Sequence, residues 1–350
     1  MEEELKSLVF VGVCAIISVS YCYYLPPKIK AGVFRLLSIL PVCALFLALP
    51  LFFSLSIFSS IAAFLLSGLA NLRLILFAFD QGPLFPLPSN LFRFTCFTCF
   101  PIQLQQNPKS HDHIPKWVFP IKVAIFTILS HIVIYKPNLP PTLLLVLHLL
   151  FVLLSIEILL TILRVVFTII LGSDLEPQFS EPYLSTSLQD FWGRRWNLLA
   201  SASFRAGVYI PARHVSNGLM SSDWGRFMGY LATFLVSGLS HELFYFYVIR
   251  ETPTWEITWF FVLHGLCTAA EVTVKRRKIL QRWWPVRPAA SRLLTMVFFV
   301  VTGAWLFLPQ FIRCNPIERG VNETLLLIDF FRRKFIHFLG YDHLNVEMDF

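Results

Sequence analysis

The sequence predicts an all-α, polytopic integral membrane protein with about eight transmembrane helices, within a range of about seven to nine. Hydrophobic residues make up 56% of the 350 residues and charged residues only 14%, whereas a soluble domain carries roughly 25% charged residues. The 36 phenylalanines exceed what a soluble core of this length needs. The low cysteine density excludes a disulfide scaffold, and the apolar content excludes a disordered chain.

Eight stretches are apolar and long enough to cross the hydrocarbon, which takes about 20 residues of helix. They are residues 7–25, 33–53, 54–79, 117–135, 142–171, 227–249, 255–274 and 293–311. Residues 322–341 are apolar only in places, because Asp329, Arg332, Arg333 and Lys334 interrupt them. We therefore expect an interfacial amphipathic helix there, with a ninth span as the alternative.

Basic residues indicate the orientation, because cytoplasmic loops collect Lys and Arg. Four basic clusters, within residues 28–35, 93–116, 194–226 and 275–287, fall on one side of the membrane in an eight-span arrangement. The basic residues near Arg332 fall on the opposite side. The net charge of +8 therefore belongs to juxtamembrane loops, and no zinc-finger spacing or RNA-binding signature points to nucleic acid.

Ionisable residues inside the spans are the candidates for chemistry, because such groups face the protein interior and often mark function. They are Arg73, His131, His148, Glu157, Arg164, His241, Glu242, His264 and Glu271. We expect Glu157 and Arg164 to form ion pairs between helices rather than to act in catalysis. We expect His131 and His148 to hydrogen-bond between helices.

His241 lies deepest in its span. Counted from Phe227, it is about 21 Å into the helix and about 12 Å from the far end at Ile249. Desolvation at this depth disfavours the protonated imidazole, and a neutral imidazole is a good proton acceptor. In the sequence SGLSHELFYFY, the small residues before it predict a close approach of another helix, and aromatic residues follow it. Spacing alone leaves a catalytic and a structural role equally open.

A second dense stretch, residues 188–197, joins the fifth and sixth expected spans and reads LQDFWGRRWN. Its polar residues alternate with aromatic ones: Asp190, Phe191, Trp192, Arg194, Arg195, Trp196 and Asn197. One interpretation is an interfacial anchor, since Trp and Arg favour the lipid–water boundary. The other is a re-entrant element that lines a buried cavity, with its arginines available to phosphates.

The segments DFWGRRWN and SGLSHELFYFY together resemble the signature of the membrane-bound O-acyltransferase (MBOAT) superfamily, in the branch of the plant wax synthases. NLRLILFAFDQGPL (71–84) and LHGLCTAAEVTVKRR (263–277) are similar to the same branch. The resemblance implies one membrane domain over residues 1–350, a helical bundle that encloses an intramembrane reaction chamber. N-terminal helices would occupy 7–171 and the catalytic segment 180–277, followed by the last span and the amphipathic helix.

The resemblance also implies the activity of a long-chain-alcohol O-fatty-acyltransferase in the endoplasmic reticulum membrane. Acyl-CoA would be the co-substrate, with no other cofactor and no metal. His241 matches the presumed general base and Asn197 the polar residue after the tryptophan motif, while His264 is a secondary candidate. Contacts to CoA are expected from Trp192, Arg194, Arg195 and Trp196. No Ser or Cys stands in a nucleophile motif, so we expect direct transfer in a ternary complex.

Several alternatives stay open. A sterol or a diacylglycerol presents a hydroxyl to the same base as a fatty alcohol. A lipid transporter is the rival from another class, although the chain lacks the corresponding halves that transporters often show. A di-iron desaturase would need more histidine clusters than His111 and His113 provide. The spacing of His337 and Asp342 fits a glycerol-phosphate acyltransferase motif, but short motifs often arise by chance.

Overall fold

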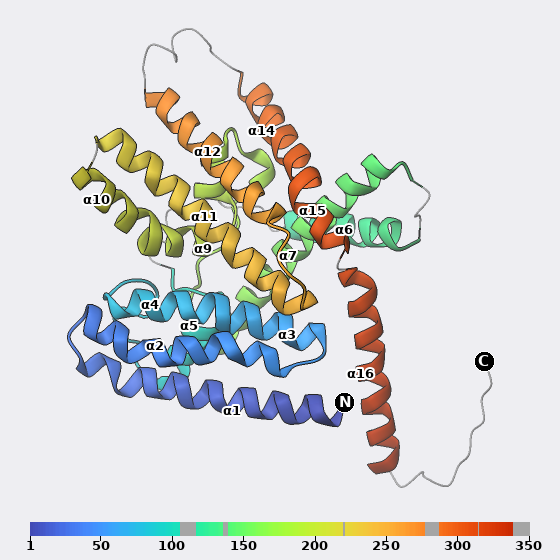
Figure 1. The fold of residues 1–350 in the computed structure, drawn as a ribbon. Helices are drawn as coiled ribbons and strands as arrows, with labels where there is room; N and C mark the ends of the chain where they lie inside the picture. The colour runs from blue at the N-terminus through green and yellow to red at the C-terminus, as the bar shows by residue number, and fades with distance from the viewer. Residues whose placement is uncertain (106–116, 136–138, 220, 277–286, 314, 339–350) are drawn as a thin grey trace.

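The structure is a computed structural model, and the residues that it describes are 1–105, 117–135, 139–219, 221–276, 287–313 and 315–338. Almost all of them lie in helices, and within these ranges the only β pairing is an isolated bridge between Leu104 and Leu175. Figure 1 shows long helices stacked side by side, with one helix, α16, set apart from the rest. The expected all-α fold is confirmed.

The chain begins with α1 (Glu2–Tyr24), α2 (Val33–Ala48), α3 (Ser56–Ala62), the π-helical η3 (Ala63–Ala70), α4 (Asn71–Ala78) and α5 (Leu91–Cys99). Its middle forms α6 (Val118–Tyr135), α7 (Pro141–Leu171), α8 (Leu188–Asp190), η5 (Phe191–Arg195), α9 (Leu198–Phe204), η6 (Arg205–Tyr209) and α10 (Ile210–Leu219). The last part forms α11 (Ser222–Ile249), α12 (Glu256–Arg276), α14 (Pro288–Thr302), η7 (Gly303–Phe307), α15 (Leu308–Arg313) and α16 (Pro316–Phe338). Short 3-10 turns are η1 (Pro26–Lys28), η2 (Leu49–Phe52) and η4 (Pro182–Leu184).

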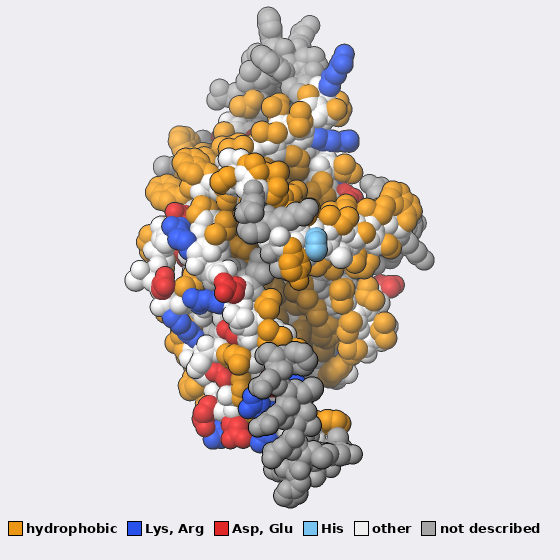
Figure 2. Space-filling model, turned by 90° about the vertical axis from the view of Figure 1, so that its right-hand side faces the viewer, with side chains coloured by type: hydrophobic (Ala, Val, Ile, Leu, Met, Phe, Trp, Pro, Cys, Tyr) orange, Lys and Arg blue, Asp and Glu red, His pale blue; other side chains and the backbone are white. Residues whose placement is uncertain are grey.

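Seven helical stretches of the described chain are long and apolar enough to cross a membrane. They are Glu2–Lys28, Val33–Phe52, Ser56–Ala78, Pro141–Leu171, Ser222–Ile249, Glu256–Arg276 and Pro288–Phe335. The eighth expected span corresponds to α6, whose apolar part, Val118–Val133, is shorter than the others. Large apolar side chains such as Phe34 and Ile169 remain more than three-quarters exposed, and Figure 2 shows hydrophobic side chains over much of one face. Such a surface suits lipid rather than water.

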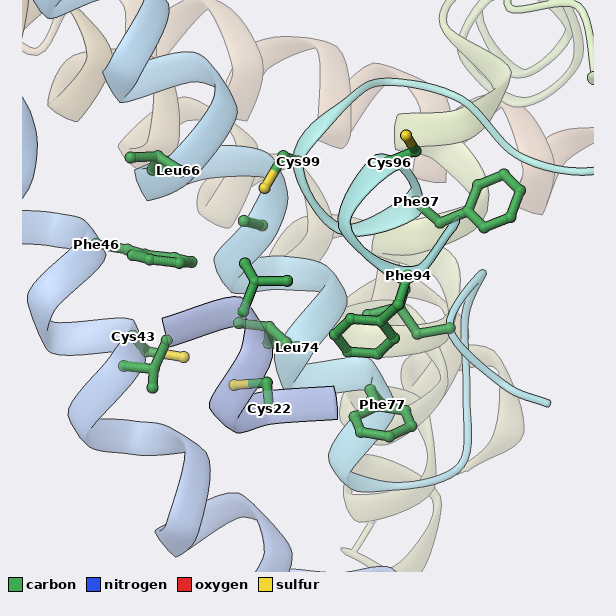
Figure 3. Packing of buried hydrophobic residues seen from close by; sticks show 14 of the residues in the cluster. Cys22, Cys43, Phe46, Leu66, Leu74, Phe77, Phe94, Cys96, Phe97 and Cys99 are labelled. Atoms are coloured by element: carbon green, nitrogen blue, oxygen red, sulfur yellow. The ribbon is translucent and has the colours of Figure 1, made fainter. Parts of the chain in front are cut away.

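The N-terminal helices α1 to α5 pack around their own apolar cluster (Figure 3). Phe46 of α2 and Leu74 of α4 are completely buried in it, and so is Cys22 of α1. The cysteines there are free thiols that pack as small apolar side chains. Burial raises the pKa of Cys99, on α5, to about 12, so this thiol stays protonated and unreactive at neutral pH.

A second apolar cluster joins α7, η5, α11, α12, α14 and α15. The antiparallel helices α11 and α12 approach closely because glycines lie between them. A Cβ atom on Gly238 would lie 2.8 Å from the Cα of Thr258, and one on Gly265 would lie 2.7 Å from the Cβ of Phe234. Only glycine permits these two contacts. The small residue before His241 thus sets how near α12 comes to the histidine.

Several of the basic groups lie at one end of the bundle. The turn after α1 meets the end of α4, where Gly32 N–H donates to the Ala78 carbonyl and Arg35 pairs with Asp80. Arg226 at the start of α11 and Lys275 near the end of α12 lie at this same end. This agrees with the expectation that these basic groups share one side of the membrane.

Helix α16 lies at the opposite end and crosses the ends of the N-terminal helices (Figure 1). Glu323 accepts hydrogen bonds from the backbone N–H groups of Ser56 and Ile57 at 2.9 and 2.8 Å, and so caps α3. Lys334 pairs with Glu2 at 3.0 Å. The helix begins at Pro316, six residues before the expected start, and its placement in the membrane interface stays a prediction.

Candidate active site

A cavity of about 570 Å³, which we call the chamber, lies among the helices of the second apolar cluster, between α7, α9, α11, α12 and the η5 segment. His241 and Asn197, which are 44 residues apart in sequence, both line it. The other expected site residues that line it are Trp192, Arg194 and Trp196. Apolar walls come from α7 and from a set of aromatic residues: Phe234, Phe260, Phe261, Phe299 and Phe307. The helices therefore bring the two sequence motifs to one chamber.

His241 is held by its own helix and by aromatic rings. Its Nδ1 lies 2.8 Å from the Ser237 carbonyl oxygen, four residues back. A carbonyl oxygen can only accept, so Nδ1 carries a hydrogen and the neutral ring has its lone pair on Nε2. The ring packs against Phe261, with centroids 4.5 Å apart. The histidine is thus in the tautomer that leaves Nε2 able to accept a proton.

Asn197 lies where the backbone turns into α9. Its φ of 41° is left-handed, a conformation that asparagine adopts more readily than most residues. Its side-chain Oδ1 accepts the Ala200 N–H at 3.2 Å and so caps the helix. With Oδ1 used in this way, the amide NH₂ group is the part of the side chain that is left to donate. Asn197 combines a structural cap with a hydrogen-bond donor at the cavity wall.

His264 holds the tryptophan loop and is not among the cavity-lining residues. It is completely buried. Its Nδ1 accepts the Trp192 indole N–H at 3.1 Å, so its Nε2, 2.9 Å from Thr302 Oγ1, is the protonated nitrogen and donates there. Thr302 in turn donates to the Phe298 carbonyl at 2.7 Å. Both ring nitrogens are therefore occupied, and the geometry makes His264 a positioning residue for Trp192.

Further bonds fix the loop on both sides. Leu188 N–H donates to Glu271 on α12 at 2.9 Å, so His264 and Glu271, on one face of α12, hold the same loop. Arg195 pairs with Asp190 at 2.8 Å and donates to the Ser180 and Glu181 carbonyls. Arg195 is not among the residues that line the cavity, whereas its exposed neighbour Arg194 is. The two arginines that sequence grouped together therefore differ in role.

A buried ion cluster connects α6, α7 and the loop. Lys122 lies 2.6 Å from Glu157 and 2.8 Å from Glu181, and Tyr183 donates to Glu157 at 3.0 Å. Burial and the neighbouring Glu157 raise the pKa of the Tyr183 hydroxyl, which therefore remains protonated. Glu157 does pair between helices as expected, and its partner is Lys122 of α6.

Three other intramembrane residues have contacts that the sequence did not indicate. His148 Nδ1 bonds the Leu144 carbonyl of its own helix at 2.8 Å rather than another helix. The His131 ring packs against Tyr135 of its own helix, with centroids 4.9 Å apart, and its expected hydrogen bond to another helix stays a prediction. Arg73 is buried and donates to the Phe97, Phe100 and Ile102 carbonyls. Histidines and arginines in helices can use nearby carbonyls, which a pattern of charged residues does not reveal.

A second, smaller cavity of about 300 Å³, which we call the basic vestibule, adjoins the first. Its charged lining residues are Arg205, Arg213, Arg226, Lys275 and Arg276. Gln189, Arg205, Tyr209 and Tyr230 border both cavities and form the neck between them. Arg226 pairs with Asp223 and Lys275 with Glu271, so the five cations exceed their two carboxylate partners. The vestibule is suited to an anion.

The chamber extends from this neck to the histidine. On α11 it is lined by Tyr230, Thr233, Phe234, Ser237 and His241, and the eleven steps from Tyr230 to His241 rise about 16 Å. The site is therefore a basic mouth joined to a mainly apolar channel with an imidazole at its depth. Such a shape fits a long molecule with an anionic head and an apolar end.

Sequence reasoning placed Arg205 and Arg213 in a basic loop but not in the site, and it missed Tyr209 and Tyr230. Little in the sequence points to these residues, because η6 and α10 reach the basic vestibule only after they fold back on α11. The candidates His111, His113 and Asp342 lie outside the described residues, as does the side chain of His337. No cluster of three or more potential metal ligands occurs in the part of the chain that the structure describes.

Comparison with known proteins agrees with the motif assignment. A family model described as "Membrane bound O-acyl transferase family" matches residues 175–263. The chain is 63% identical over 338 residues to probable long-chain-alcohol O-fatty-acyltransferase 7 of Arabidopsis thaliana, covering 97% of this chain and 99% of that protein. It is 61% identical over 339 residues to number 8 of the same series, covering 97% of this chain and 100% of that protein. The matched family segment contains both Asn197 and His241.

Proposed function

The chain belongs to the membrane-bound O-acyltransferase family, and on this basis we propose that it transfers the acyl group of a fatty acyl-CoA to a long-chain fatty alcohol, giving a wax ester and CoA. The observation that carries the proposal is the meeting of His241 and Asn197 at one chamber with a basic mouth. The fatty-alcohol acceptor follows the printed names of the relatives. The endoplasmic reticulum membrane is the proposed location.

The chemistry needs a proton acceptor beside the alcohol. As the alcohol oxygen bonds to the thioester carbonyl carbon, Nε2 of His241 takes the hydroxyl proton. The tetrahedral intermediate then collapses, the carbon–sulfur bond breaks, and the departing CoA sulfur receives the proton from the imidazolium. Such general-base assistance contributes typically about 10²–10⁴-fold. The bond from Nδ1 to the Ser237 carbonyl supports this role, since it leaves Nε2 unprotonated.

Asn197 is proposed to stabilise the negative charge that develops on the carbonyl oxygen. Its Oδ1 is committed to the Ala200 N–H, so its NH₂ group can donate to an oxyanion in the chamber. We propose direct transfer from the thioester to the alcohol. In support, His241 bonds a backbone carbonyl rather than a serine hydroxyl, and no acyl-enzyme is needed.

The basic vestibule is proposed to bind the phosphates of CoA. Arg213 supports this, because its buried Nε has no hydrogen-bond partner among the described residues. Arg205 at the neck lies 5.9 Å from the Tyr209 ring and is held there by a cation–π contact. Arg194, on the cavity wall, adds a further cation. Arg195 is left out of this proposal, since its guanidinium holds the loop.

The test is to express the full chain in yeast that lacks its neutral-lipid acyltransferases and to measure esters by mass spectrometry. Cells receive a long-chain alcohol, a sterol or neither. We expect wax esters with the alcohol and none with His241→Ala at equal protein level. Sterol esters in place of wax esters would transfer the proposal to a sterol acceptor. Undiminished wax ester from His241→Ala would reject the general base.

A further inference from the structure

Thr268 of α12 has a hydroxyl group that the protein leaves without a partner. The residue is only 1% exposed, and its Oγ1 has no hydrogen-bond partner among the described residues. Thr258, near the start of α12, likewise has an unpartnered Oγ1 but lines neither cavity, whereas several threonines elsewhere in the helices are satisfied. Thr233, Thr273, Thr295 and Thr302 each donate to the carbonyl four residues back. A buried hydroxyl without a bond costs about 1–3 kcal/mol, so its retention calls for an explanation.

Thr268 lies at the wall of the chamber. Thr268 is one of the residues that line the cavity, together with Gln189 and Tyr230 at the neck. A polar group that a buried pocket leaves unpartnered is available to a ligand, and it discriminates against ligands that cannot bond to it. The remaining question is which part of the ligand reaches this level.

The close contacts between α11 and α12 give the register. Gly238 lies against Phe261 and Gly265 lies against Phe234. Along the antiparallel pair, the residue number on α11 therefore decreases by one for each increase of one on α12. Thr268 is then level with Leu231, about 15 Å along the axis from His241. The side chains of His241 and Thr268 lean toward each other, because each points toward the start of its own helix. Thr268 therefore lies between the vestibule and the reacting end of the channel.

We propose that the Thr268 hydroxyl hydrogen-bonds the pantothenate portion of the acyl-CoA arm and so selects a full-length CoA thioester as the donor. This inference rests on the proposed function. With the thioester at His241 and the phosphates in the vestibule, the arm passes Thr268 beyond the amide nearest the sulfur. The arm carries one amide and one hydroxyl there, and a threonine hydroxyl can donate to or accept from either.

The test compares two donors on the purified full chain. One is a fatty acyl-CoA and the other is the same acyl group on N-acetylcysteamine, which ends after the amide nearest the sulfur. Thr268→Val removes the hydroxyl and keeps the shape, and Thr268→Ser keeps the hydroxyl. Thr273→Val is the matched control, because that hydroxyl donates to Ala269 at 2.8 Å and the residue is in neither cavity lining.

We expect Thr268→Val to raise KM for acyl-CoA about three- to tenfold with kcat little changed, as for an interaction present in both the ground and transition states. KM for the short donor should not change, and Thr268→Ser should restore the wild-type value. An equal effect on both donors, an effect on KM for the alcohol, or no effect would overturn the inference. If Thr268→Val does not fold, the wild-type protein decides: a CoA analogue whose pantothenate amide is replaced by methylenes must bind more weakly. Absence of wild-type turnover would instead reject the proposed function.

Discussion

The N-terminal helices and the catalytic region use the same apolar composition to build opposite interiors. Around Cys22, Phe46 and Leu74 the side chains fill the space between α1, α2 and α4, and Arg73 donates to three carbonyls. In the catalytic region the helices enclose a chamber of about 570 Å³. Buried polar atoms without a partner among the described residues occur in both regions, such as Arg73 Nε in the first and Thr268 Oγ1 in the second. The difference is therefore the enclosed space: a filled interior serves as a scaffold, and an interior with a chamber can hold a ligand.

The helix geometry follows the same division. The π-helical segments η5, η6 and η7 each supply cavity-lining residues, among them Trp192, Arg205 and Phe307. Such segments often occur at functional sites, because an extra residue in a turn re-aims side chains. The π-helical η3 of the N-terminal region instead packs its buried residues into the apolar cluster. The position of a π segment, rather than its presence, therefore indicates the site.

The largest difference should separate the cavity-lining His241 from the buried His264. His241→Gln removes the proton acceptor, so kcat should fall about 10²–10⁴-fold with thermal stability preserved. His264→Gln should mainly cost stability, on the order of 1–3 kcal/mol, because Trp192 and Thr302 lose a partner. Turnover by purified protein and thermal unfolding in detergent measure the two effects. Equal losses of kcat with equal stability would show that both rings act in the chemistry.

Asn197 should come next, and its two tasks can be separated. Asn197→Asp keeps an oxygen for the Ala200 N–H but removes the amide donor, so kcat should fall about 10²–10³-fold. Asn197→Ala also removes the cap and should cost about 1 kcal/mol of stability more. The measurements are kcat and the unfolding temperature of both variants. Near-normal turnover by Asn197→Asp would reduce the residue to a helix cap.

A substitution of Arg73 tests whether the N-terminal helices serve only as a scaffold. Arg73→Met leaves the carbonyls of Phe97, Phe100 and Ile102 without their donor, so stability should fall on the order of 1–3 kcal/mol. The kcat of the protein that remains folded should stay within about twofold. Thermal unfolding and turnover per folded molecule check this. A large loss of kcat at unchanged stability would mean that the N-terminal helices take part in the reaction.

The smallest effect is expected from a substitution in the basic vestibule. Arg213→Gln removes one of several cations, so KM for acyl-CoA should rise about three- to tenfold, more at low salt than at high salt. KM for the alcohol should not change. Arg319→Gln on α16, at the opposite end of the bundle, is the matched control and should have no effect. A salt-independent change would argue against phosphate binding in the vestibule.

Much of the fold was predictable, because its signals are local. Apolar length located the spans, and the glycine before His241 suggested a close helix contact that Gly238 indeed makes with Thr258. The expected boundaries differ by a few residues where polar residues continue a helix, as at the start of α11. The remaining expected span, 117–135, corresponds to α6 (Val118–Tyr135).

The site was predictable only in part, for a related reason. Asn197 and His241 stand in motifs, so the sequence names them. Arg213 stands outside the recognised segments, and Thr268 stands in one of them without a chemical signal of its own. They reach the basic vestibule and the chamber because α10 and α12 pack against α11. The partners of Glu157 and Arg73 likewise depend on segments far along the chain. Roles that arise from packing are visible only when the helices are assembled.

The conformation of Asn197 limits which amino acids this position accepts. The backbone there is left-handed, with a φ of 41°, which excludes β-branched residues and favours Asn, Asp and Gly. Glycine has no oxygen for the cap, and aspartate has no N–H to donate. Glutamine has the same amide, but its longer side chain does not suit the cap. One amino acid therefore meets the steric and the chemical demand together, and a replacement breaks at least one of them.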